Sequence, residues 1–149
     1  MKLEDEIKQT RFTSAQHKAL VNIIFTANWA NARLREIIKT HHITLQQYNV
    51  LRILRGKYPK SANPGEIKSV MLDKNPDLTR LCDRMCTQGL ISRTIDEVNR
   101  RKMNICITEK GLQVLELTDP EVHKLEPLMV HLGDAEAEQL SDLLDKLRG

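Results

Sequence analysis

The segment at residues 89–111 constrains the fold of this chain more than any other feature. Two short runs of strand-forming residues, 90–95 and 103–108, flank a polar tip. In the second run apolar and polar residues alternate, which is the period-two pattern of a half-buried strand. The tip carries three adjacent cations: Arg100, Arg101 and Lys102. A hairpin with such a tip is a poor core element and is suited to the groove of a polyanion.

A predicted helix at residues 76–88 comes directly before this hairpin. Asn75 and Pro76 form a start signal, and Gly89 is well placed to end the helix. At helical spacing the apolar side chains share one face; these are Leu78, Leu81, Cys82, Met85 and Cys86. The opposite face holds Pro76, Thr79, Arg80, Asp83, Arg84 and Thr87. A helix followed by a basic hairpin is the layout of a winged helix-turn-helix, which indicates DNA binding.

Helical patterns dominate the chain before this unit. Apolar residues recur at helical spacing over residues 9–39, which predicts a first long helix. Thr44 and Gln47 fit a capping box that would begin the second helix. Asn63 followed by Pro64 predicts the start of the third. Because the first helix is longer than one small core can cover, we expect part of it to pack on a partner chain.

After the hairpin, Thr108 is expected to cap a fifth helix, which Pro120 and Pro127 should kink or interrupt. Gly133 and Asp134 would open a last helix. The predicted fold is mainly α (α+β), with four helices, two strands and two helices in order. Residues 44–110 would form a winged helix-turn-helix DNA-binding lobe, and residues 9–39 and 111–148 would form dimerisation helices.

The distribution of charge supports a polyanionic partner. The net charge of the chain is +3. Lys and Arg outnumber Asp and Glu over residues 50–110, whereas residues 111–149 are acidic. Aromatic residues make up 3% of the chain, which disfavours a stacking platform for single strands.

Other functional classes find less support in the sequence. No apolar run approaches the roughly 20 residues of a membrane span, so we expect no membrane partner. Three cysteines without paired spacing favour a reduced, cytoplasmic setting. We find no phosphate loop, nucleophile elbow or acid–base carboxylate pair. The sequence therefore predicts neither an enzyme nor a cofactor.

In its residue pattern the chain resembles the MarR (multiple antibiotic resistance regulator) family of winged-helix repressors. The first part of the pattern is matched by Thr79, Arg80, Asp83, Arg84, Gly89, Leu90, Ile91 and Arg93. It continues with Asp96, Arg100, Arg101, Ile107, Thr108 and Gly111. The resemblance covers roughly residues 43–148. It implies that residues 1–149 form a single subunit of this kind.

The resemblance implies that the helix at residues 76–88 enters the major groove and that the wing reaches the adjacent minor groove. The expected DNA contacts are Thr79, Arg80, Arg84, Arg100, Arg101 and Lys102. A helix fits the major groove, and arginines suit a narrow minor groove. Asp83 and Asp96 are expected to orient cations, with Asp83 pairing with Arg80, Arg84 or a residue of the wing.

The resemblance also implies partners. The expected form is a homodimer on a pseudo-palindromic operator of double-stranded DNA, and specifically a repressor that a small-molecule ligand releases. A ligand pocket is implied near the junction of the DNA-binding and dimerisation helices, but the sequence offers no motif that names its residues.

Two alternatives remain open. The first is a thiol- or metal-responsive regulator of the same fold. Cys82 and Cys86 lie one helical turn apart, although a disulfide at this spacing needs distortion and a buried thiol is the commoner outcome. The five histidines lack metal-site spacing, so no metal site is predicted. The second alternative is a winged-helix module that binds proteins and not DNA.

Overall fold

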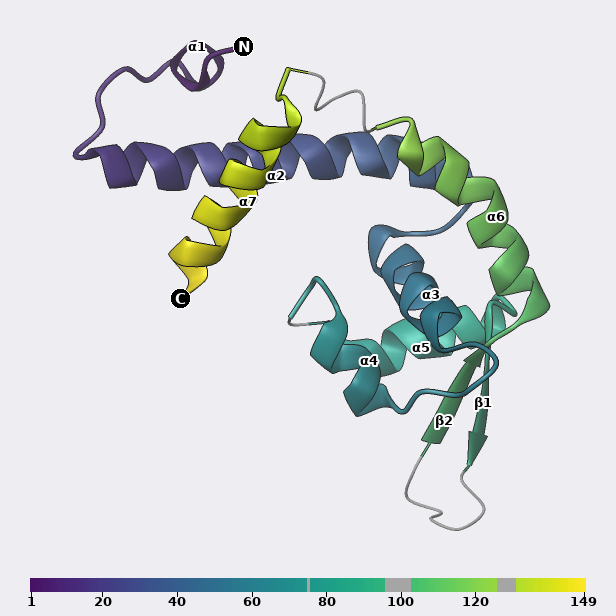
Figure 1. Ribbon diagram of the computed structural model, residues 1–149. Coiled ribbons are helices and arrows are strands. Elements are labelled where there is room, and N and C mark those ends of the chain that lie inside the picture. The colour runs from purple at the N-terminus through teal and green to yellow at the C-terminus, as the bar shows by residue number, and fades with distance from the viewer. Residues whose placement is uncertain (75, 96–102, 126–130) are drawn as a thin grey trace.

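The computed structural model describes the chain except for residues 75, 96–102 and 126–130. The described part is mainly helical, as predicted, with one two-stranded sheet (Figure 1). The elements are α1 (Leu3–Ile7), α2 (Ala15–Lys39), α3 (Leu45–Lys57), α4 (Pro64–Val70), α5 (Leu78–Thr87), β1 (Ile91–Ile95), β2 (Met103–Ile107), α6 (Glu109–His123) and α7 (Asp134–Arg148).

The long first helix begins later than predicted. The structure starts α2 at Ala15 and not at residue 9, and a short additional helix, α1, precedes it. Ser14 has an extended backbone, and its hydroxyl accepts the N–H of His17. This local cap satisfies a free donor at the helix start, so the helix begins there.

The predicted capping box at the start of α3 is confirmed. The Thr44 hydroxyl accepts the Gln47 N–H at 3.2 Å, and the Gln47 side chain accepts the Thr44 N–H at 2.9 Å. Asn63 and Glu66 make the same reciprocal pair at the start of α4. These bonds satisfy backbone donors that a helix cannot satisfy itself.

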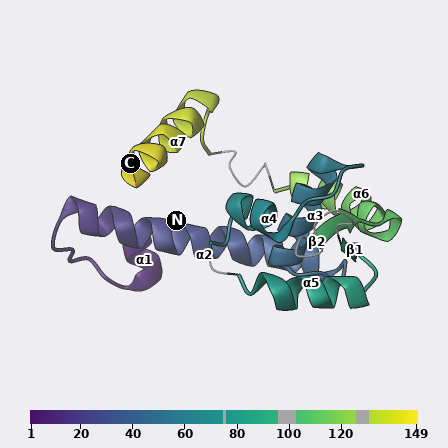
Figure 2. The ribbon, with the colours of Figure 1, turned by 90° about the horizontal axis from the view of Figure 1, so that it is seen from below.

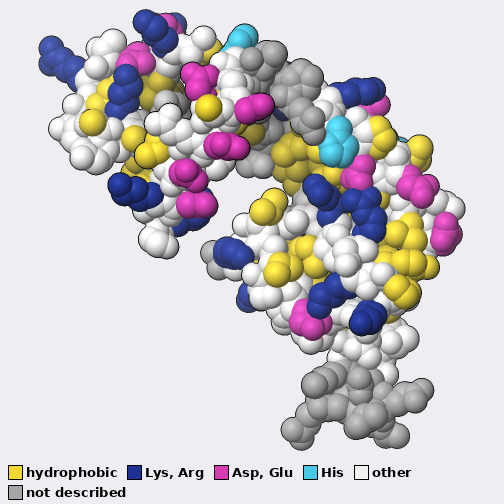
Figure 3. All heavy atoms as spheres, viewed as in Figure 1, with side chains coloured by type: hydrophobic (Ala, Val, Ile, Leu, Met, Phe, Trp, Pro, Cys, Tyr) yellow, Lys and Arg dark blue, Asp and Glu magenta, His cyan; other side chains and the backbone are white. Residues whose placement is uncertain are grey.

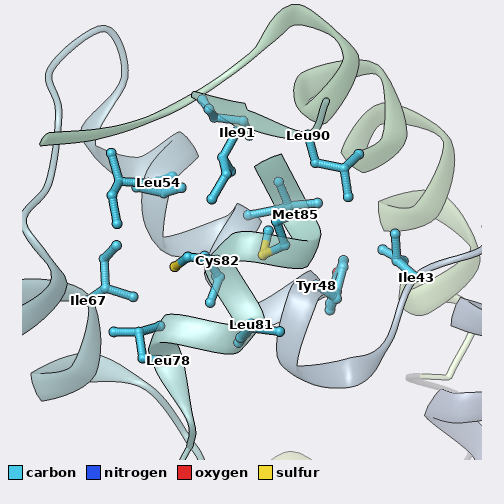
Figure 4. Close-up of a cluster of buried hydrophobic side chains, with 14 of the residues drawn as sticks. Ile43, Tyr48, Leu54, Ile67, Leu78, Leu81, Cys82, Met85, Leu90 and Ile91 are labelled. Atoms are coloured by element: carbon cyan, nitrogen blue, oxygen red, sulfur yellow. The ribbon is translucent and has the colours of Figure 1, made fainter. Parts of the chain in front are cut away.

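The hairpin packs into the main core through one face. β1 and β2 are antiparallel, with Ile91 opposite Ile107. Ile105 exchanges two backbone hydrogen bonds of 2.9 Å with Ala62, which ties the hairpin to the loop after α3. Leu78, Leu81, Cys82 and Met85 of α5 point toward Leu54, Ile67 and Ile91 in this core (Figure 4).

Gly111, near the start of α6, packs closely against Leu51 of α3 and against Leu90 and Ile107 of the hairpin. Thr108 caps this helix as predicted, because its hydroxyl accepts the Gly111 N–H at 3.1 Å. A Cβ atom at Gly111 would lie 2.3 Å from the carbonyl oxygen of Leu90 and 2.7 Å from a side-chain carbon of Ile107. The close approach of α6 to the hairpin therefore requires glycine.

The predicted interruption at Pro120 is wrong, because α6 continues through this residue to His123. Leu115 and Thr118, just before the proline, are fully buried. Packing of this turn outweighs the one hydrogen bond that proline cannot donate. Pro127 lies outside the described residues.

The DNA-binding lobe predicted from sequence, which includes α3 to β2, lies at the C-terminal end of α2, and α6 packs against α2 and α3 (Figures 1 and 2). α7 begins after Gly133, as predicted, but none of its residues is buried. In Figure 3 open space separates the end of α7 from the lobe. No helix in the described ranges is long and apolar enough to cross a membrane.

Candidate nucleic-acid interface

The outward face of α5 is the centre of the candidate interface. Thr79, Arg80, Asp83 and Arg84 are all exposed on it. On the apolar face of the same helix Leu78, Leu81, Cys82 and Met85 are buried and Cys86 is half-buried. The burial confirms the predicted division of this helix into two faces. An exposed, cation-bearing helix of this kind can present its side chains to base edges or phosphates in a major groove.

The start of α5 differs from the prediction. The helix begins at Leu78, with Asp77 as its cap, and not at Pro76. The Asp77 carboxylate accepts the Arg80 N–H at 3.2 Å and also lies 3.2 Å from Arg80 Nε. Asp77 therefore satisfies a backbone donor and holds the first arginine of the face near the helix start.

Asp83 pairs with Arg93 of β1. Arg93 Nη2 donates to Asp83 Oδ1 at 2.6 Å and lies 3.4 Å from the Thr79 carbonyl oxygen. Burial disfavours the charge on Arg93, but the hydrogen bond to Asp83 outweighs it, so the pKa of Arg93 is raised. One arginine of the hairpin thus holds two points on the outward face of α5.

Arg93 was not among the predicted site residues. It was visible in the sequence as part of the family pattern, and a residue of the wing was one of the partners expected for Asp83, but the sequence did not single out Arg93. Four predicted residues, Asp96, Arg100, Arg101 and Lys102, lie outside the described residues, and their roles stay predictions.

The cysteines on α5 have different surroundings. Cys82 is buried, and this burial raises the pKa of its thiol. Since the thiolate is the reactive form, Cys82 is poorly suited to sensing an oxidant. Cys86 is half-buried, and both residues are free thiols. Among the described residues no three His, Cys, Asp or Glu side chains gather into a possible metal site.

A cavity of about 350 Å³ opens beside the outward face of α5. Its walls come from the segment that runs from the end of α2 to the start of α3, and from α5 with the residue that caps its C-terminus. It is lined by Lys39, His42, Ile43, Thr44, Gln47, Leu81, Arg84 and Gln88. Within the wall Gln47 Nε2 donates to Gln88 Oε1 at 2.6 Å. Because the lining residues come from two segments far apart in the sequence, 39–47 and 81–88, the sequence could not identify this cavity.

A polar cluster of Tyr48, Arg55 and Asp119 joins α6 to α3. Tyr48 donates its hydroxyl hydrogen to Asp119 Oδ1 at 2.8 Å, and Arg55 pairs with the other oxygen of the same carboxylate. Burial, together with the bond to Asp119, raises the pKa of Tyr48 to about 12. Burial also opposes the charge on Asp119, but the bonds from Arg55 and Tyr48 prevail and lower its pKa. The lobe is thereby tied to the helix that leads toward the C-terminus.

Comparisons with known proteins agree with this architecture. Residues 43–103 match the model of the MarR family. A MarR transcription factor from Planctomyces limnophilus is 32% identical, with a TM-score of 0.68, over 91% of this chain and 98% of that one. A putative MarR-like regulator from Bacillus cereus has a TM-score of 0.79 at 20% identity, over 89% of this chain and 95% of that one.

Two further proteins are similar to this chain. The MepR–DNA complex of S. aureus shares the fold with a TM-score of 0.77 at 19% identity, covering 90% of this chain and 96% of MepR. The transcriptional repressor MprA of Escherichia coli K12 is 26% identical over 113 residues, 75% of this chain. The match spans 64% of the length of MprA.

Proposed function

This chain belongs to the MarR family, and from that premise we propose that it is a transcription regulator that binds double-stranded DNA through α5 and the β1–β2 wing. The observation that carries the proposal is the outward face of α5, where Thr79, Arg80 and Arg84 are exposed and Arg93 fixes the hairpin beside them. The shared fold with MepR, a protein solved on DNA, supports the same assignment. The proposal includes no catalytic step.

The experiment is fluorescence anisotropy of the full chain on DNA from its own upstream region, titrated with salt. Cationic contacts to phosphates release counterions, so we expect tight binding with a steep negative salt slope. Arg100→Ala/Arg101→Ala tests the predicted wing contacts and should flatten the slope. Affinity no greater than that for random DNA would favour a protein-interaction module over a regulator that binds this region.

We propose that the active form is a homodimer. The chain exposes 11081 Å² of surface, whereas a compact monomer of 17.2 kDa exposes roughly 7,800 Å². This excess is an area per chain, so a dimer that covered it on both chains would bury a total area at the upper end of the range for obligate dimers. Exposed apolar residues on α2 and α7 would supply the interface: Leu20, Ile24, Leu140, Leu143 and Leu147. A two-fold dimer would place two α5 helices on the half-sites of a pseudo-palindromic operator.

We further propose that the cavity beside α5 binds a small anionic effector that releases DNA, which would make the protein a repressor. Its volume suits a small molecule. Lys39 and Arg84 supply positive charge, while Ile43 and Leu81 supply apolar walls. Because Arg84 also belongs to the outward face of α5, an anion bound here would compete with DNA for the same guanidinium.

A further inference from the structure

We infer that Ile95 and Met103 form an apolar contact with the deoxyribose edge of the DNA strand that passes between α5 and the wing. The inference rests on the proposed DNA binding and adds a class of contact that the cationic residues do not provide. The two residues are cross-strand partners and form the last pair of the β1–β2 register, at the C-terminal end of β1 and the N-terminal end of β2. Both are exposed, Ile95 by 67% and Met103 by 37%.

The register of the hairpin places this pair on the face that looks toward α5. Successive pairs point to opposite sides of a sheet, so every second pair shares a face. Ile91 pairs with Ile107, Arg93 with Ile105, and Ile95 with Met103. We call the face that carries these three pairs the inner face of the hairpin and the opposite one the outer face. On the inner face Ile91, Ile105 and Ile107 are buried in the core, and Arg93 pairs with Asp83 of α5. The third pair therefore continues the inner face by about 7 Å beyond Arg93.

The chemistry of the two hairpin faces favours a sugar contact. The outer face carries Ser92, Thr94, Asn104 and Cys106, whereas the inner face stays apolar beyond the part that the core covers. With α5 in the major groove and the wing in the adjacent minor groove, the strand between the two grooves lies against this inner face. The deoxyribose carbons are the apolar part of that strand, and proteins that bind the minor groove use Ile and Met side chains beside their cations.

The contact should be visible as affinity lost without a change in salt dependence. Ile95→Ala should weaken binding about fivefold to tenfold, since it removes apolar surface that DNA covers. The salt slope should equal that of the wild type, because no counterion is involved. The heat-capacity change of binding, measured by calorimetry, should become less negative.

Matched variants make the test specific. Thr94→Ala, the neighbouring position on the outer face, and Ile95→Val should both bind within twofold of the wild type. Met103→Ala provides a second test at the same contact, so a poorly folded Ile95→Ala protein, identified by its melting temperature, would not end the experiment.

The outcomes separate this inference from the proposed function. Wild-type binding with unaffected Ile95→Ala and Met103→Ala variants overturns the apolar contact alone. A flattened salt slope in both variants also overturns it, because the residues would then act through the charged contacts. Failure of the wild-type protein to bind any DNA overturns the proposed function and the contact with it.

Discussion

Asp83 of α5 and Arg93 of β1 form an ion pair 2.6 Å long that joins the outward face of α5 to the hairpin. The same guanidinium approaches the Thr79 carbonyl oxygen, so it holds α5 at two successive turns. A carboxylate on a face meant for DNA would otherwise repel phosphate. The pairing with Arg93 explains why Asp83 is present on this face. The ion pair fixes the orientation of α5 relative to the hairpin, and we propose that both elements contact the duplex.

Asp83→Asn should therefore weaken DNA binding, by about threefold to tenfold, although it removes a negative charge from the interface. The loss would come from a wing that is no longer held against α5. Anisotropy at fixed salt measures the change, with Asp142→Asn on α7 as a control of equal charge. If Asp83→Asn instead binds more tightly, Asp83 acts by repulsion and has no positioning role.

Substitutions can distinguish effector binding in the cavity from DNA binding by the outward face of α5. Lys39 lines the cavity without belonging to the α5 face, whereas Arg84 belongs to both. Benzoate, a carboxylate on an apolar ring, is the probe. Lys39→Met should keep DNA affinity but require more benzoate for release, and Arg84→Ala should lose about 1–3 kcal/mol of DNA binding as well. Equal benzoate sensitivity in Lys39→Met and wild type would contradict this location.

The cluster of Asp119, Tyr48 and Arg55 predicts a loss of stability in acid. The pKa of folded Asp119 lies below its ordinary value of 3.8, so its contribution is present above that pH and is lost as the pH falls through the lowered value. Asp119→Asn should cost about 1–3 kcal/mol of unfolding free energy at neutral pH. Urea titrations from pH 5 downward should show the two proteins converging; a constant difference would contradict the assignment.

The same cluster predicts a separate effect in base. Folding raises the pKa of Tyr48 from 10 to about 12, so its contribution is full below pH 10 and is lost as the pH rises toward 12. Phenolate absorbance should show one tyrosine that ionises late in the folded wild type. Tyr48→Phe should remove that late step, and a late step that persists in this variant would contradict the assignment to Tyr48.

The exposed leucines of α7 test the proposed dimer. Leu143 is 57% exposed in the single chain, so a charge there should be tolerated by a monomer and excluded from an apolar interface. Leu143→Glu should sediment as a monomer and bind a two-half-site DNA at least tenfold more weakly. Asp142→Asn, its neighbour, should remain a dimer; a dimeric Leu143→Glu protein would show that α7 is not in the interface.

Predictions from sequence succeeded where a structure is determined by neighbours along the chain. Thr44, Asn63 and Thr108 cap helices through side chains three residues from their partners, and each was predicted. The two faces of α5 follow from helical period in the same way. These features depend on backbone donors that have few other ways to be satisfied.

Features that depend on distant parts of the chain could not be predicted. Tyr48 and Asp119 are separated by 71 positions, and the walls of the cavity come from two segments far apart in the sequence. The interruption predicted at Pro120 was wrong for the same reason, because burial of Leu115 and Thr118 stabilises the helix through this residue. Arg93 belonged to a recognisable pattern, but its contact with α5 needed the folded register.

The position of Arg84, on a cavity wall and on the outward face of α5 at once, has a quantitative consequence under the proposed function. Two ligands that exclude each other at one side chain weaken each other by the same factor, whichever binds first. The amount of effector needed for release would then rise with the number of operators present. Extra copies of the operator would desensitise the regulator without any change in the protein.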